Sequence, residues 1–158
     1  MDKHSKKKNI LIALIALTLC FIWGNSLMPA SLSGAISGWV KNVLSAILGN
    51  MGSSVTSDDG VLRKIAHASE FALLGALLTA LMADKLRQRL PVVALCGLGA
   101  AFIDETIQLF VNGRSGQVKD VWIDLAGFGI GIAITCLILK LIYNGRTRHL
   151  RRANCPKP

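Results

Sequence analysis

The sequence predicts an all-α integral membrane protein: a bundle of four transmembrane helices, with an extracytoplasmic amphipathic interfacial helix between the first and second spans. Three observations predict this class: the hydrophobic content, the length of the apolar runs and the one-sided distribution of basic residues. Of the 158 residues, 52% are hydrophobic, and the mean hydropathy is positive. A soluble bundle would need a polar face on every helix, and the first apolar run has almost none.

Four apolar runs approach the ~20 residues that a helix needs to cross ~30 Å of hydrocarbon. They cover approximately residues 9–28, 62–83, 90–111 and 121–143. We therefore expect a basic cytoplasmic N-terminus at residues 1–8, a four-helix membrane domain at 9–143 and a basic cytoplasmic tail at 144–158. The start of the chain resembles a signal peptide but has no convincing cleavage site, so we expect an uncleaved first span.

The basic residues are distributed unevenly along the chain. The net charge is +9, and thirteen of the 18 Lys and Arg residues fall within residues 3–8, 85–89 and 140–157. With four spans, these segments share one side of the membrane, and the positive-inside rule identifies that side as the cytoplasm. We expect both termini to be cytoplasmic, with membrane lipids as partners and no nucleic acid. The four cysteines have no metal-site or disulfide spacing, so we expect no metal and no cofactor.

The segment after the first span has the periodicity of an amphipathic helix. Apolar residues between Leu32 and Leu48 recur at i, i+3, i+4 and i+7, while Lys41, Asn42 and Ser45 fall on the other side. A helix over residues 31–49 can lie in the outer membrane interface with Trp39 at headgroup level. It can equally pack over the mouth of the bundle, and the sequence leaves both arrangements open.

Ionisable residues interrupt the apolar runs near their outer ends. In the second run, Arg63, His67 and Glu70 share one helical face, whereas Lys64 is expected to point away and reach the headgroups. In the third run, Glu105 and Asp104 precede Gln108 by about one turn. Further polar positions are Arg114 in the turn before the fourth run, and then Asp120 and Asp124 on a face continued by Gly127 and Gly131.

The depths of these residues agree between the helices. At ~1.5 Å per residue, the charges of all three helices fall in one outer layer. We therefore predict an outward-facing polar site. Ion pairs that only hold the helices together are the alternative, but buried ion pairs stabilise proteins poorly. The candidate ligand-binding residues are Arg63, His67, Glu70, Glu105, Gln108, Arg114, Asp120 and Asp124.

Three motifs, RKIAHASEF, DETIQLFVNGRSG and DVWIDLAGFGIG, resemble those of the VanZ-like family of bacterial membrane proteins in order and spacing. The resemblance implies a four-span protein of the bacterial cytoplasmic membrane, in a family whose namesake acts in teicoplanin resistance. Asp104 falls at a variable position of the family, and Asn112 stands where the family often has Pro. The family signature falls on the eight candidates above and on Lys64, Gly113 and Gly127.

The first functional hypothesis is binding or resistance. A lipoglycopeptide antibiotic such as teicoplanin carries an acyl tail that anchors it at the outer leaflet. An outward polar site could bind such an amphiphile or a lipid-linked cell-wall precursor, with Arg63 and Arg114 engaging anionic groups. The apolar face of residues 32–48 would then meet the acyl chain.

Two other hypotheses remain open, so the sequence does not decide whether the protein is an enzyme. In an enzyme acting on a lipid or cell-wall intermediate, His67 would be a general base oriented by Glu70 or Glu105. A metal-dependent version would use the carboxylates with His67, although the two arginines would repel a cation. The third hypothesis is a small proton-coupled carrier, but the inner halves of the spans carry almost no polar groups.

Overall fold

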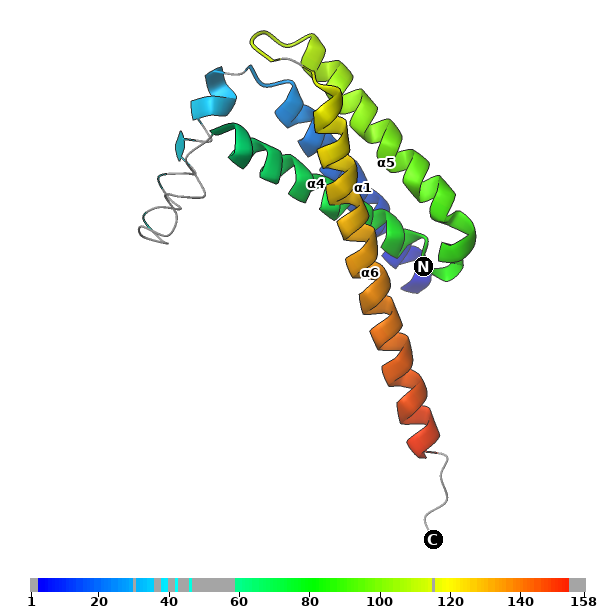
Figure 1. Ribbon diagram of the computed structural model, residues 1–158. Coiled ribbons are helices and arrows are strands. Elements are labelled where there is room, and N and C mark those ends of the chain that lie inside the picture. Colours follow the sequence, from blue (N-terminus) through cyan, green and yellow to red (C-terminus); the bar gives the residue numbers. More distant parts are fainter. Residues whose placement is uncertain are drawn as a thin grey trace.

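The structure, a computed structural model, describes residues 3–29, 31–35, 38–39, 42, 46, 59–114 and 116–153, which contain helices and no strand. The main helices are α1 (Lys3–Ser26), α4 (Asp59–Leu81), α5 (Leu86–Leu109) and α6 (Val118–Ala153) (Figure 1). A short 3-10 helix, η1 (Ala83–Lys85), joins α4 to α5.

Four helical segments are long and apolar enough to cross a membrane: His4–Ser26, Arg63–Leu81, Ala83–Leu109 and Val118–Gly145. The third segment comprises η1 and α5. The predicted fold class, an all-α protein with four membrane-spanning helices, is confirmed. The predicted interfacial helix over residues 31–49 lies for the most part outside the described residues.

Helices α4 and α6 pack backbone against backbone because glycines line their interface. A Cβ atom at Gly127 would collide with the carbonyl of Ala68, and one at Gly131 would collide with the carbonyl of Ala72. Gly75 of α4 fits in the same way against the carbonyl of Phe128. Small residues allow this close approach of helices in a bilayer, where the apolar surroundings give no hydrophobic drive for association.

The buried apolar core is small. It contains Ile22, Phe71, Leu74, Val93, Ala100, Ala101, Val121 and Phe128. The Phe128 ring packs against α5, where a Cβ at Gly97 would lie only 2.5 Å from the ring. Many large apolar side chains of all four helices are instead exposed, as expected where the surrounding medium is lipid.

Three helix boundaries differ clearly from the sequence prediction. Helix α1 begins at Lys3, before the predicted start at residue 9, so residues 3–8 of the predicted N-terminal segment are helical. Helix α5 begins at Leu86, before the predicted start at residue 90, and Pro91 lies within it. Helix α6 continues to Ala153, so residues 144–153 of the predicted tail are helical. The sequence has no proline between Pro91 and Pro156, so none interrupts α6. At ~1.5 Å per residue the 36 residues of α6 span about 54 Å, and its C-terminal part extends past the other helices in Figure 1.

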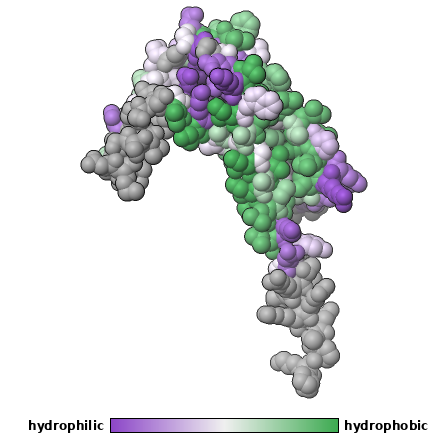
Figure 2. All heavy atoms as spheres, viewed as in Figure 1, coloured by the Kyte–Doolittle hydropathy of each residue, from purple (hydrophilic) through white to green (hydrophobic). Residues whose placement is uncertain are grey.

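The bundle has two chemically different ends. At one end, here called the basic end, His4 of α1 lies 3.6 Å from Asp84 in η1. At the other end, here called the cluster end, Arg114 of the α5–α6 connection contacts Asn25 of α1. Figure 2 shows hydrophilic side chains gathered at the ends and a largely hydrophobic surface between them.

Candidate functional site

Asp104 lies at the centre of the polar cluster. Its side chain is fully buried. Ser26 Oγ donates to its Oδ1 at 2.7 Å, and Gln108 Nε2 donates to its Oδ2 at 2.8 Å. That same Oδ2 lies 3.8 Å from Nδ1 of His67. The family resemblance places Asp104 at a variable position, whereas in the structure Asp104 connects α1, α4 and α5.

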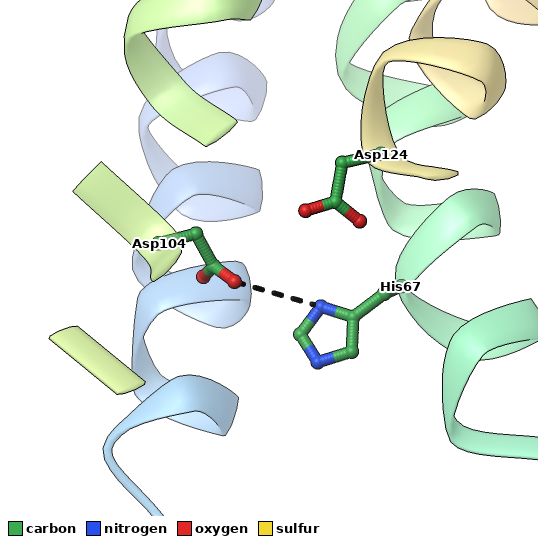
Figure 3. A group of neighbouring side chains, drawn as sticks. All are labelled: His67, Asp104 and Asp124. Atoms are coloured by element: carbon green, nitrogen blue, oxygen red, sulfur yellow. Dashed lines mark ion pairs between the residues drawn. The ribbon is translucent and has the colours of Figure 1, made fainter. Parts of the chain in front are cut away.

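His67 of α4 and Asp124 of α6 point towards Asp104 (Figure 3). One ligand atom from each of the three residues lies within 4.8 Å of the other two. Asp124 is only 2% exposed. Within the described part of the chain, neither Asp124 Oδ2 nor His67 Nδ1 has a hydrogen-bond partner. The group therefore brings together buried polar atoms from three helices, and two of these atoms have no hydrogen-bond partner among the described residues.

The side chain of Glu70 forms its hydrogen bond with α1 and not with His67. Asn25 Nδ2 donates to Glu70 Oε1 at 2.8 Å. The other carboxylate oxygen of Glu70 is buried and has no hydrogen-bond partner among the described residues. Glu70 therefore belongs to the α1–α4 interface at the cluster end.

Glu105 anchors the connection between α5 and α6. Its Oε2 accepts a hydrogen bond from the backbone N–H of Gln117 at 2.9 Å, and Gln108 Nε2 lies 3.5 Å from its Oε1. In the same turn Gly113 has a φ of 77°, a value that favours glycine. The expectation that Glu70 or Glu105 orients His67 is wrong, because both carboxylates have other partners and the acid facing His67 is Asp104.

Within the part of the chain that the structure describes, three cationic side chains belong to the cluster. Lys64 Nζ lies 3.3 Å from Asp120 Oδ1, so the expectation that it points away to the headgroups is wrong. Arg63 is half-buried. Arg114 Nη2 donates to the backbone carbonyl of Asn25 at 3.0 Å, while its buried Nε and Nη1 find no acceptor among the described residues. Burial and, to a smaller degree, the charge of Arg63 lower the pKa of Arg114 from its usual value.

A small cavity of about 10 Å³ lies inside the cluster. This volume is room for about one water molecule. Only a small ligand, or one group of a larger ligand, could therefore enter the cluster as it stands. The residues that line the cavity are Arg63, Lys64, His67, Glu105, Gln108, Asp120, Ile123 and Asp124.

A separate, mainly apolar groove of about 390 Å³ lies between α1 and α4. Its walls include Leu17, Phe21 and Leu73, and its polar members are Thr18, Ser69 and Glu70. Asn25 donates to Glu70, which lines the groove, and accepts from Arg114. A chain of two hydrogen bonds therefore connects the groove to the Arg114 guanidinium.

The structure brings all eight predicted site residues into one layer. Six of them line the cavity, and the other two, Glu70 and Arg114, are joined through Asn25. Sequence reasoning missed Asn25 and Ser26 and undervalued Asp104. The sequence feature that could have identified Asn25 and Ser26 is their position as a polar pair at the end of an otherwise apolar run. Such a pair indicates that this helix end contacts other polar groups.

The comparisons with known proteins identify the family of the chain. No curated protein and no solved structure matches the chain. A family model described as VanZ/LLP1 matches residues 10–140. That range covers well over half of the chain and extends from Ile10 of α1 to Lys140 of α6, so it includes every residue of the cluster. The chain therefore belongs to the VanZ/LLP1 family.

Proposed function

We propose that this VanZ/LLP1 protein binds the anionic headgroup of an amphiphile at the outer leaflet of the bacterial cytoplasmic membrane. Arg63 and Arg114 are the anion-binding groups. The observation that carries the proposal is the guanidinium of Arg114, which is partly buried and has two nitrogens without an acceptor among the described residues. Guanidinium binds phosphate and carboxylate through paired N–H groups. An anion at this position would satisfy both nitrogens and offset the repulsion from Arg63.

The apolar groove supports an amphiphile over a water-soluble anion. The groove between α1 and α4 is lined mainly by side chains that suit an acyl chain. Its polar end, at Glu70, is connected to Arg114 through Asn25. A ligand with its head at Arg114 and its tail in the groove would contact both features.

The orientation in the membrane follows from the basic residues. The basic end carries the lysines of the N-terminus and the basic residues of the α4–α5 connection, which the positive-inside rule assigns to the cytoplasm. The cluster end would then face outwards, with both termini in the cytoplasm. Suitable ligands at that surface are a lipid-linked cell-wall precursor or a lipoglycopeptide antibiotic such as teicoplanin, and family membership supports a role in glycopeptide resistance.

Antibiotic susceptibility in a susceptible Gram-positive host tests this proposal. The strains carry the wild-type protein, Arg114→Gln, the control Arg89→Gln at the basic end, or an empty vector, with expression checked. The wild type and Arg89→Gln should protect against teicoplanin and not against vancomycin, and Arg114→Gln should lose the protection. If the well-expressed wild type does not protect, the resistance role is wrong. If Arg114→Gln protects as well as the wild type, the anion-binding assignment is wrong.

A second candidate function is catalysis on a lipid or cell-wall intermediate. The observation that favours it is the His67–Asp104 pair beside a cavity of about one water. His67 would act as general base, and Asp104 would orient the imidazole. An assay in which membranes containing the protein are incubated with labelled lipid extracts distinguishes the two functions. A new product that requires His67 and forms over many turnovers supports an enzyme, and saturable binding without product supports a binding protein.

A further inference from the structure

We propose that His67, Asp104 and Asp124 form a divalent-cation site, with Zn²⁺ as the best-matched ion. The site combines one imidazole nitrogen and two carboxylates from α4, α5 and α6. Zn²⁺ accepts this mixture of nitrogen and oxygen ligands. The inference is independent of the headgroup site proposed at Arg63 and Arg114.

The distances are close to those of a coordinated ion. His67 Nδ1 lies 3.8 Å from Asp104 Oδ2, and the ligand atoms of all three residues lie within 4.8 Å of one another. At Zn–N and Zn–O distances of ~2.0–2.2 Å, two ligand atoms of a tetrahedral ion lie ~3.3–3.6 Å apart. Closing the group around an ion therefore requires the three side chains to move together by up to ~1.5 Å, from the arrangement drawn in Figure 3.

The unused bonding capacity of the buried atoms is an independent indication of a ligand. Asp124 is 2% exposed, yet its Oδ2 has no hydrogen-bond partner within the described residues, and the same holds for His67 Nδ1. Buried polar atoms normally have a partner, because leaving one unsatisfied costs ~1–3 kcal/mol. A single cation between them would satisfy both atoms.

The surroundings resemble those of a metal site. Ser26 and Gln108 donate to the two oxygens of Asp104, as the neighbours of metal-binding carboxylates commonly do. The cavity of about 10 Å³ borders His67 and Asp124, which leaves room for about one water as a further ligand. Three protein ligands and one water is the arrangement of a zinc site that keeps an open position.

The charge balance also favours a cation, despite the nearby arginines. The cationic side chains of the cluster are Arg63, Lys64 and Arg114. They face five carboxylates, those of Glu70, Asp104, Glu105, Asp120 and Asp124. The carboxylates outnumber the cationic side chains, and a divalent cation among them would reduce their mutual repulsion. The repulsion by the two arginines, which counted against a metal in the sequence, is therefore opposed by nearby carboxylates.

Metal binding by the purified full-length protein in detergent tests this site. The protein carries an affinity tag without histidine, is stripped with a chelator and is then titrated with Zn²⁺, or with Co²⁺ as a spectroscopic probe. We expect stoichiometric Zn²⁺ by elemental analysis and the intense visible absorption of low-coordinate Co²⁺. The isosteric variant Asp124→Asn and the variant His67→Asn should each weaken binding by more than about tenfold, since they remove direct ligands.

Two matched variants distinguish this site from adventitious binding. His4→Asn removes a histidine that lies beside an aspartate at the basic end, and Glu70→Gln removes a carboxylate of the same layer that is not part of the group. Both should bind Zn²⁺ like the wild type. The proposal is overturned if the wild type takes up no stoichiometric metal, a result that does not depend on any variant folding. It is also overturned if Asp124→Asn and His67→Asn, with unchanged helix content, bind as tightly as the wild type.

Discussion

Among the residues that the structure describes, two histidine–aspartate pairs lie at opposite ends of the bundle. At the basic end, His4 and Asp84 lie 3.6 Å apart, with side chains that are 59% and 73% exposed. At the cluster end, His67 and Asp104 lie 3.8 Å apart, with side chains that are 13% and 0% exposed. The residue types and the distances nearly match, whereas the surroundings differ completely.

The comparison shows that burial, and not the pairing itself, distinguishes a candidate site. In the exposed pair, water solvates both partners, and such pairs contribute little to stability. In the buried pair, Asp104 has two further donors, Ser26 and Gln108, and Asp124 lies next to it. Loss of one member there leaves several buried groups without partners, which makes the arrangement both costly to disturb and chemically distinctive.

The largest expected effect comes from forcing apart the helices that carry the buried group. Gly127→Leu should destabilise the protein by about 3 kcal/mol, since its side chain would press on the backbone of Ala68, beside His67. Steric trapping in bicelles measures this free energy of unfolding. Gly129→Leu is the matched control, because a Cβ at Gly129 meets nothing within 4 Å. Equal effects of the two changes would mean that the α4–α6 contact does not hold the group together.

The second-largest effect is expected from replacing the buried Asp104, in comparison with the exposed Asp84. Asp104→Ala should lower the free energy of unfolding by about 2 kcal/mol, because Ser26, Gln108 and His67 each lose a buried acceptor or neighbour. The same measurement on Asp84→Ala should give no resolvable change. A similar loss for both aspartates would contradict the distinction between the two ends.

A smaller effect is expected for the ion pair at the edge of the cluster. The Lys64 and Asp120 side chains are 43% and 19% exposed, at an N–O distance of 3.3 Å. Lys64→Met should cost about 0.5 kcal/mol, and the loss should shrink as salt is added. A loss as large as that of Asp104→Ala, unchanged by salt, would mean that Lys64 belongs to the buried network.

The smallest effect is expected at the exposed pair. His4→Asn should leave thermal unfolding, followed by circular dichroism in detergent, unchanged at neutral pH, because both side chains are largely in contact with solvent. A clear drop in the unfolding temperature would show that the basic end contributes to folding more than its exposure indicates.

The sequence predicted the fold class and the layer of the site, because run length, charge spacing and helical periodicity depend only on local order. It did not predict which residue lies at the centre. The position of Asp104 depends on how α1 rotates against α5 to bring Ser26 to it. The pairing of Lys64 likewise depends on the close approach of α6 to α4, which the glycines permit. Helix boundaries were missed where no residue forces the helix to end, as after residue 143 of α6.

The small apolar core has a consequence for how the protein responds to temperature. Many of the large apolar side chains that the structure describes are exposed in the folded state, and separation of the helices within a bilayer would expose the others to lipid and not to water. The heat-capacity change that curves the stability of soluble proteins comes from the hydration of newly exposed surface. Dissociation of this bundle in lipid should therefore have a heat-capacity change near zero, with a stability that varies almost linearly with temperature and no cold-induced dissociation.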